Sequence, residues 1–445
     1  MTTAEGKKRK VLIVSFYFPP TNSIAAVRVG KFAKYLPQFG WEPIVLTADT
    51  AKDRPQTLPV EVDETNIFRM PYFAVASSLY RNLKSNKVAP SGPFSQKFNW
   101  KAPIYRALRL AQPIYTLSIL APLVSDPIGW YPHAVEKGRE ILKQYEIDAI
   151  FSSYSPSTSH LVARRLHQIS GIPWIAEFRD LWAFNHNART TRFLRYLTSR
   201  MERRVMKGSS LLIAASEPAA EQLERLHSKK TVTILNGFDE DDYTGEIPLT
   251  SKFTITYTGQ IYYSRKHDPS LFFLALKELQ TEAKVSPQTL EVRFFGGDLV
   301  AAATPLIERY GLGDLVKVYD HIPFRESVRR QRESSVLLML KWNDPVAKGM
   351  YGGKLFEYLG ARRPILAVGS FPDEYVDNLL IQSGTGIVVD NVIMMKNVLT
   401  RWLDEWQESG RIVSYWEPRP DVIQRYTRRA QAGRLAQLLE EASGH

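Results

Sequence analysis

The 445-residue sequence contains no cysteine, so disulfide bonds and thiolate metal sites are excluded. This composition is typical of a protein from a reducing compartment. The sequence also lacks an apolar run of the roughly 18 residues that a membrane-spanning helix needs. Its start, MTTAEGKKRK, lacks the apolar core of a signal peptide. We therefore expect a cytoplasmic protein, with peripheral attachment to the inner face of the cell membrane as its closest association with lipid.

Acidic residues are missing from one long internal segment, residues 66–125. Cations and aromatic side chains are interleaved in it, namely Arg69, Arg81, Lys84, Lys87, Lys97, Lys101, Arg106 and Arg109 with Tyr72, Phe73, Tyr80, Phe94, Phe98, Trp100 and Tyr105. Together with a net charge of +12, the segment predicts an anionic partner. Its apolar continuation, residues 104–124, fits a helix in a membrane interface, so we expect an anionic membrane surface. A solvated insertion packed on its own domain is the alternative. Nucleic acid is not expected, because no recognised binding motif accompanies the charge.

Short apolar runs alternate with helical stretches through the whole chain. The predicted strands are residues 11–16, 43–48, 148–153, 174–178, 211–216 and 232–236, then 254–259, 291–297, 316–320, 336–340, 364–369 and 386–390. The length exceeds what one hydrophobic core usually supports, so we expect two doubly wound α/β domains. Charged and turn residues crowd together after Asn236, which places the domains at residues 1–238, including the insertion 66–125, and 239–415. The arginine-rich end, residues 416–445, is expected to pack back on the first domain.

The first predicted helix has an apolar stripe that would cover its sheet. The stripe comprises Val27, Phe32, Tyr35, Leu36 and Phe39, with Arg28, Lys31 and Lys34 outside it. Gly40 follows as a stop signal. Strand, helix and strand then form a parallel crossover unit.

A glycine pair opens the helix that follows the predicted strand 336–340. Gly352 and Gly353 would bring free backbone N–H groups and the positive end of the helix dipole to an anion. Lys354 adds a full positive charge, and Glu357, one turn on, could accept hydrogen bonds from a ribose diol. A diphosphate fits this pattern; the alternative is a tight turn with a solvated lysine and an ordinary helix glutamate.

A second cationic loop follows the predicted strand 254–259. Gly259 ends the strand, and Arg265, Lys266 and His267 precede the next helix. Because ligands bind beyond the carboxyl ends of the strands in open parallel sheets, both loops are expected at one phosphate-binding edge.

Two loops of the first domain could serve a second substrate. Glu177 lies at the end of the predicted strand 174–178, and Arg179, Asp180 and Trp182 follow it. There they could orient hydroxyls or stabilise a leaving phosphate. An Arg–Asp pair that caps a helix is the alternative. In the first loop, Thr21, Asn22 and Ser23 could touch a ligand, although capping of the following helix is the safer prediction.

Several segments resemble those of family 4 glycosyltransferases, over nearly the whole chain. They are VLIVSFYFPP, FSSYSPSTSHLVA, PWIAEFRDLW, ILNGFD, YTG with a lysine before the next helix, and GKLFEYLGARRPIL. The resemblance implies the α/β GT-B fold, which has two facing Rossmann-like domains with a cleft between them. It further implies a nucleotide-sugar donor held mainly by the second domain, an acceptor held mainly by the first, transfer with retention, and no metal or cofactor besides the nucleotide-diphosphate sugar co-substrate.

Family roles can be carried onto individual residues. The lysine that contacts the donor diphosphate matches Lys266, whereas the arginine expected directly after the strand glycine is Gln260 here. The ribose-binding glutamate matches Glu357, and the first glutamate of the family's pair falls on Gly349. The full expected donor site comprises Gly259, Gln260, Arg265, Lys266, Ile322, Phe324, Arg325, Tyr351, Gly352, Gly353, Lys354, Leu355 and Glu357, with Ile322, Pro323 and Phe324 in the segment that meets the nucleobase.

The function expected from these features is transfer of a sugar to a lipid-linked or membrane-proximal glycan acceptor during cell-surface polysaccharide assembly. The expected catalytic residues are Lys266, Glu357, Arg179 and Asp180, and the expected acceptor-binding residues are Thr21, Asn22, Ser23, Glu177 and Trp182. Two alternatives remain, a nucleotide-sugar epimerase of the same fold and a non-catalytic binding protein for sugar nucleotides or polysaccharide. The departures at Gln260 and Gly349 suggest the second of these.

Overall fold

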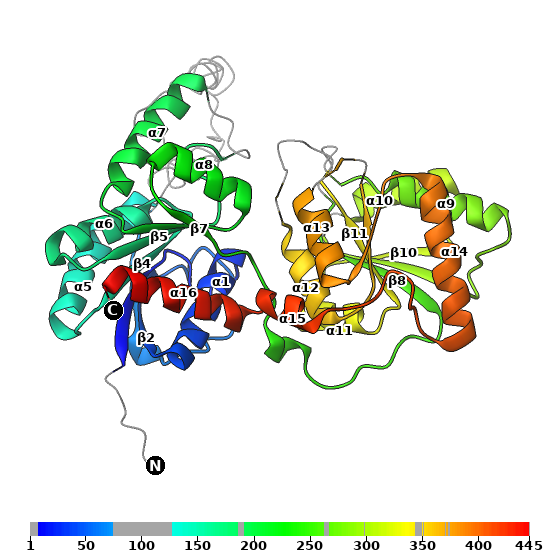
Figure 1. The fold of residues 1–445 in the computed structure, drawn as a ribbon, viewed down its shortest axis with the longest axis horizontal. Coiled ribbons are helices and arrows are strands. Elements are labelled where there is room, and N and C mark those ends of the chain that lie inside the picture. The colour runs from blue at the N-terminus through cyan, green and yellow to red at the C-terminus, as the bar shows by residue number, and fades with distance from the viewer. Residues whose placement is uncertain are drawn as a thin grey trace, which may run out of the picture. The chain divides into compact units, whose positions relative to one another are not determined.

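A computed structural model describes residues 8–73, 127–185, 191–261, 267–297, 299–342, 349, 351–369, 371–372 and 374–444. Most of the basic segment expected at a membrane, and also Arg265 and Lys266, lie outside these residues. The chain divides into two compact units: Met1–Ile234 with Ala432–His445, and Leu235–Gln431. Each unit is an open parallel sheet with helices on both faces (Figure 1).

The N-terminal unit contains a seven-stranded sheet in the order β3-β2-β1-β4-β5-β6-β7. Its strands are β1 (Arg9–Val14), β2 (Trp41–Ala48), β3 (Ile67–Met70), β4 (Ala149–Tyr154), β5 (Trp174–Phe178), β6 (Leu211–Ala214) and β7 (Thr231–Thr233). Its helices are α1 (Ile24–Tyr35), α5 (Tyr131–Gln144), α6 (Thr158–Ser170), α7 (Arg192–Met206), α8 (Glu217–His227) and most of α16 (Arg428–Ser443).

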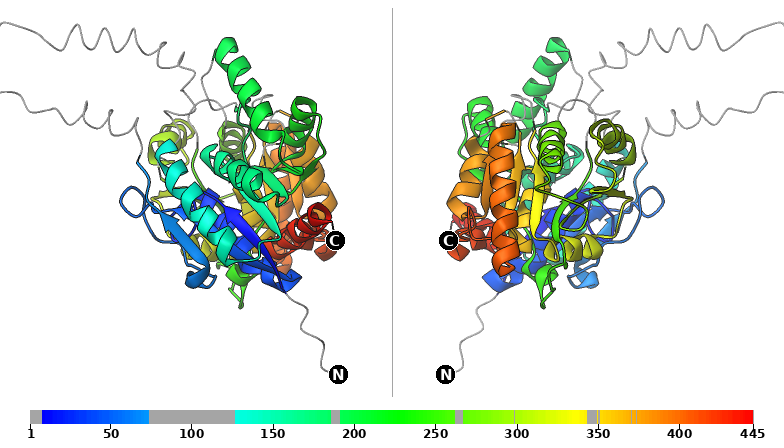
Figure 2. Two further views of the ribbon diagram at one scale, coloured as in Figure 1. Left: turned by 90° about the vertical axis from the view of Figure 1, so that its left-hand side faces the viewer. Right: turned by 90° about the vertical axis from the view of Figure 1, so that its right-hand side faces the viewer.

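Alternation of side chains along β1 fills two cores in this unit. Leu12 and Val14 join the core beneath α5, α6 and α8, while Val11 and Ile13 join the core beneath α1 and α16. Strands buried on both faces read as continuous apolar runs, which is why the sequence pattern identified them. The two helix layers are visible on either side of the sheet in Figure 2.

The C-terminal unit contains a six-stranded sheet in the order β10-β9-β8-β11-β12-β13. Its strands are β8 (Phe253–Thr258), β9 (Leu290–Phe295), β10 (Val316–Tyr319), β11 (Val336–Leu340), β12 (Ile365–Val368) and β13 (Gly386–Val389). Its helices are α9 (Ser270–Thr281), α10 (Leu299–Tyr310), α11 (Phe324–Arg332), α12 (Gly353–Ala361), α13 (Glu374–Ser383), α14 (Val392–Ser409) and α15 (Pro420–Ile423). Leu338 packs with α9, α10 and α14, and Leu337 with α12 and α13 on the other face.

Both sheets reverse their strand order once, between β1 and β4 and between β8 and β11. At the second of these points, β8 leads toward α9 on one face, whereas β11 leads toward α12 on the other. The connections diverge there, and in such sheets this is where ligands bind. The predicted loops at Gly259, at Gly353 and after β1 belong to these two points, whereas the predicted loop after β5 follows the strand beside β4.

The C-terminal segment differs from the expectation that residues 416–445 pack on the first domain. Only Ala432–His445 belong to the N-terminal unit. The preceding residues stay with the C-terminal unit because Phe238 exchanges backbone hydrogen bonds with Tyr426 and Arg428, and Ile423 packs in the core around α12. The division after Ile234 lies four residues before the expected limit at 238.

Candidate functional site

The two predicted donor loops of the C-terminal unit meet at the ends of β8 and α12. Gly259 follows β8 with a φ of +143°, a conformation that side-chain-bearing residues rarely adopt. A Cβ added to Gly259 would lie 3.3 Å from Cε of Lys354. The glycine thus allows the strand end to lie against the lysine stem, and the structure joins two segments that the sequence places far apart.

Helix α12 begins at Gly353 with Gly352 as its N-cap, and no side chain caps it. A Cβ added to either glycine would meet no atom of the described residues within 4 Å, so among these residues nothing packs against the two glycines. The first N–H groups of a helix have no intrahelical acceptor. An uncapped helix end beside a lysine is therefore suited to an anion.

A hydrogen-bond network fixes the residues behind this helix end. Nζ of Lys354 lies 3.0 Å from Oε2 of Glu357. Nε2 of Gln331 donates to the same Oε2 at 3.0 Å and to Oγ1 of Thr258 at 3.0 Å. Tyr358 accepts from the Thr258 backbone N–H at 3.1 Å, and burial raises the pKa of this tyrosine above its usual range. The network ties β8, α11 and α12 together and holds Glu357 in one orientation.

Gln331 is a site residue that sequence reasoning missed. It is fully buried, and its Oε1 has no hydrogen-bond partner among the described residues. Its sequence context, RRQRE, is typical of an exposed helix face and gives no indication of this role. Only the packing of α11 against β8 and α12 reveals it.

The segment expected to meet a nucleobase lies between β10 and α11. Ile322 is half-buried, while Phe324 and Arg325 at the start of α11 are exposed. Phe295 and Tyr319, at the ends of β9 and β10, stack with ring centroids 4.7 Å apart. This edge of the sheet therefore offers accessible aromatic surface, a suitable contact for a base.

Other predicted donor residues have different surroundings. The backbone carbonyl of Gln260 accepts a hydrogen bond from Tyr257 Oη at 2.9 Å. Tyr351 is half-buried, and its ring lies 5.9 Å from that of Phe356. Leu355 is fully buried in the core and donates its backbone N–H to Gly352, so its side chain is not open to a ligand. Arg265 and Lys266 lie outside the described residues.

In the N-terminal unit, a buried ion pair joins α1 to β5, the strand next to β4. Nε of Arg28 donates to Oε1 of Glu177 at 2.9 Å, and a second guanidinium nitrogen donates to the Ile234 carbonyl at 2.7 Å. Ser153 donates to the other carboxylate oxygen of Glu177 at 2.6 Å. Arg28 and Glu177 are 1% and 0% exposed. Arg28 thus lies in the interior rather than beside Lys31 and Lys34, and Glu177 is enclosed rather than open to an acceptor.

Arg179 lies next to this pair and reaches the carboxyl end of β4. It donates to Ser153 Oγ at 3.1 Å and to the Ser155 carbonyl at 2.8 Å. Burial lowers the pKa of its guanidinium, with the charges of Glu177 and Asp180 acting in the opposite direction. The capping alternative is not what the structure shows, because Arg179 bonds to β4 instead. Asp180 is exposed, whereas Trp182 is 7% exposed and stacks on Tyr154 at 6.0 Å.

The first loop mainly secures its own helix. Ser23 Oγ accepts from the Ala26 backbone N–H at 3.1 Å, so the predicted helix cap is confirmed. Thr21 is buried against Thr50 with 2.6 Å between the hydroxyl oxygens. Asn22 is exposed and donates to Thr57 at 2.8 Å. Of the three, Asn22 has the most accessible side chain for an acceptor.

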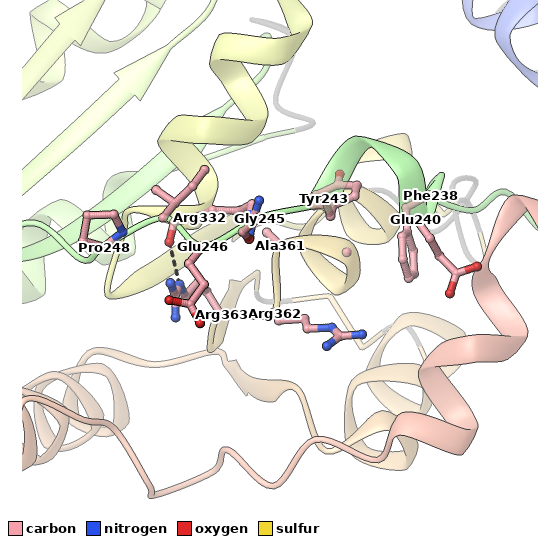
Figure 3. A pocket seen from close by; sticks show the side chains of 12 residues that line it. Phe238, Glu240, Tyr243, Gly245, Glu246, Pro248, Arg332, Ala361, Arg362 and Arg363 are labelled. Carbon is pink, nitrogen blue, oxygen red and sulfur yellow. Dashed lines mark hydrogen bonds between the residues drawn. The ribbon is translucent and has the colours of Figure 1, made fainter. Parts of the chain in front are cut away.

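A separate pocket of about 510 Å³ lies at the opposite end of α12 from Gly353 (Figure 3). Arg332, Arg362 and Arg363 line it together with Glu240 and Glu246. Arg332 donates to the carbonyls of Thr244 and Gly245, and Arg363 donates to the carbonyl of Arg332 at 2.7 Å. These contacts connect the end of α11 to residues 244–245 and to Arg363, and the predicted donor loops lie at the other end of α12.

Within the described part of the chain, no group of three His, Asp or Glu side chains is arranged to hold a metal ion. No helix there is both long and apolar enough to cross a bilayer.

Comparison with known proteins finds a family model that matches part of the chain and solved structures that share its fold. Residues 88–242 match the model of Glycosyltransferase Family 4. The chain is similar in structure to sucrose-phosphate synthase from Thermosynechococcus elongatus, with a TM-score of 0.59, 14% identity, and coverage of 97% of this chain and 98% of that one. It is also similar to HepE of Anabaena in complex with UDP and glucose, with a TM-score of 0.56, 14% identity, and coverage of 97% and 100%. A comparison with curated proteins gives no match. The GT-B fold expected from the sequence is confirmed.

Proposed function

We propose that this chain is a retaining glycosyltransferase that transfers a sugar from a nucleoside-diphosphate sugar to a lipid-linked or membrane-proximal glycan. The GT-B fold and the match of residues 88–242 to the Glycosyltransferase Family 4 model support this proposal. The product would be a cell-surface polysaccharide or its precursor. The supporting observation is the open N-terminus of α12 beside Lys354, at the reversal point of the C-terminal sheet.

The donor diphosphate would bind the free N–H groups of Gly353 and Lys354. As the sugar leaves, negative charge grows on the β-phosphate, and fixed positive groups that already face it stabilise this charge without reorganising. The Lys354 ammonium and the helix terminus supply such groups in the described residues, and Lys266 is the further cation expected from the sequence. Glu357, held by Gln331 and Lys354, would accept from the ribose diol.

HepE was crystallised with UDP and glucose, which makes UDP-glucose the first donor to test. The acceptor hydroxyl would attack from the face that the diphosphate leaves, which gives retention without a protein nucleophile. In the N-terminal unit, the exposed Asp180 and Asn22 are the residues we assign to acceptor contact. The enclosed Glu177 instead orients Ser153 and, through it, Arg179.

A panel of nucleotide sugars with and without glycan acceptors tests this function. We expect release of nucleoside diphosphate that rises with acceptor, and a product whose anomeric configuration by NMR equals that of the donor. A donor sugar whose configuration changes without acceptor would indicate an epimerase. Binding of nucleoside diphosphate without turnover of any donor would indicate a binding protein.

A matched pair of variants links the activity to the site. Lys354→Met removes the ammonium beside α12, whereas Lys277→Met removes an exposed lysine of α9 in the same unit. We expect turnover to fall in the first variant only. Equal turnover in both would contradict the assignment of Lys354.

A further inference from the structure

Helix α7 exposes a continuous basic and aromatic face that the proposed function does not use. Its sequence is RFLRYLTSRMERRVM. At 100° per residue, six of its exposed side chains fall within about one third of the circumference. They are Arg192, Phe193, Tyr196, Arg200, Arg203 and Arg204.

The other face of α7 anchors the helix to its unit. Leu194, Val205 and Met206 are buried. Glu202, the single acidic residue of α7, is also buried, where it accepts from the Ala183 backbone N–H at 2.8 Å and lies 3.0 Å from Nε2 of His227. The negative charge of α7 therefore lies inside, and its solvent face presents only positive charge.

Two large aromatic side chains lie among these arginines. Phe193 is 57% exposed and Tyr196 is 52% exposed. Arg200 donates to Tyr196 Oη at 2.9 Å, and its guanidinium carbon lies 5.7 Å from the tyrosine ring centroid. Exposed aromatic surface of this size is unfavourable in water, and rings flanked by cations are typical of helices that lie on anionic membranes.

The position of α7 suits a planar partner. The helix stands out at the periphery of the N-terminal unit in Figure 1 and in both views of Figure 2. The outer face of a single helix has no groove, so it fits a planar surface better than it fits a peptide that needs a groove. The neighbouring helix α8 exposes Glu221 and Glu224. The acidic side chains of α8 therefore do not extend the basic face of α7.

We infer that the solvent face of α7 binds the headgroups of anionic phospholipids, with Phe193 and Tyr196 at headgroup depth. This contact is separate from segment 66–125 and does not depend on the proposed transferase activity. It would hold the N-terminal unit at a bilayer through four guanidinium groups and two rings.

Vesicle flotation of the full chain tests this surface, with phosphatidylcholine vesicles that contain or lack 30% phosphatidylglycerol. The test variant is Arg192→Gln/Arg200→Gln/Arg203→Gln/Arg204→Gln. Each cation near an anionic bilayer is worth about fivefold in binding, so four give a loss of up to several hundredfold, and salt should weaken what remains. The charge-matched control Arg139→Gln/Lys143→Gln/Arg165→Gln/Lys230→Gln changes exposed cations elsewhere on the same unit and should lose much less.

A fluorescent label locates the contact. Because the chain has no cysteine, Tyr196→Cys on α7 and Gln168→Cys on α6 can each be labelled at a single site with an environment-sensitive dye. We expect a blue shift on anionic vesicles for position 196 and none for position 168. Wild-type protein that stays unbound, a quadruple α7 variant that floats like wild type, or a dye at position 196 that does not respond would each overturn the inference. Donor turnover with a soluble acceptor should be unchanged in the quadruple variant, so this test and that of the transferase fail independently.

Discussion

The ion pair between Arg28 and Glu177 permits a prediction whose size follows from burial. In Arg28→Met, the Glu177 carboxylate stays inside the sheet and keeps the hydrogen bond from Ser153, while the Ile234 carbonyl loses its guanidinium donor. Removing one partner of a buried pair typically costs about 3–5 kcal/mol, because an uncompensated charge is left in the interior. We expect the N-terminal unit to lose roughly 4 kcal/mol of its free energy of unfolding.

Differential scanning calorimetry of the full chain measures this loss. For a unit of this size, each kcal/mol lowers the melting temperature by about 2–4 °C, so the shift should be roughly 8–16 °C. The variant Arg28→Met/Glu177→Gln removes both charges and should recover more than half of it. Lys31→Met is the control, since it removes a positive charge from the same helix at a partly exposed ion pair with Glu61 and should cost less than about 1 kcal/mol.

The reasoning would be refuted by an Arg28→Met protein that melts within about 2 °C of wild type. It would also be refuted if the double variant were no more stable than the single one. Either result would mean that Arg179 and Ser153 compensate the Glu177 charge without Arg28.

Three further predictions concern the donor edge and the N-terminal core. Gly259→Ala places a Cβ 3.3 Å from Lys354 at a φ of +143°, so we expect calorimetry to show donor binding weakened several-fold. The control is Gly297→Ala, whose Cβ has no described neighbour nearer than 3.9 Å, and its donor affinity should be unchanged. Burial lowers the pKa of His160 to about 3, so the folded state disfavours its protonation; the stability that this histidine contributes is present above pH 6.5 and is lost as the pH falls toward 3. The free energy of unfolding should therefore fall less steeply over that range in His160→Gln than in wild type, and equal slopes would exclude this role. Ser23→Ala should cost about 1 kcal/mol through loss of the α1 cap, and Ser23→Asp should restore it in thermal melts.

The sequence pattern predicted the sheets well because their strands are buried on both faces. Continuous apolar runs such as VLLML need no partner to be recognised, and the strand β11 lies at residues 336–340 as predicted. The pattern predicted the ends of the strands less accurately. The first strand is Arg9–Val14 rather than residues 11–16, because pairing of Arg9 and Lys10 with Trp41 and Glu42 extends it toward the N-terminus.

Long-range polar partners were beyond the reach of the pattern. Arg28 looks like the solvent-exposed lysines beside it, and its partner Glu177 lies 149 residues away. Gln331 lies among arginines in the sequence, yet its amide joins Thr258 to Glu357 across three elements. Its place in a motif assigns Leu355 to the donor site, and the pattern does not indicate that its side chain is fully buried.

Titration calorimetry with UDP tests the central claim that a nucleoside diphosphate binds at the N-terminus of α12. Loss of a hydrogen bond to a charged group costs about 1.5–3 kcal/mol, so we predict that Lys354→Met binds UDP roughly 10- to 150-fold more weakly than wild type and that Lys266→Met/Lys354→Met binds more weakly still. Lys277→Met should bind like wild type. Unchanged affinity in both the single and the double variant would contradict the account.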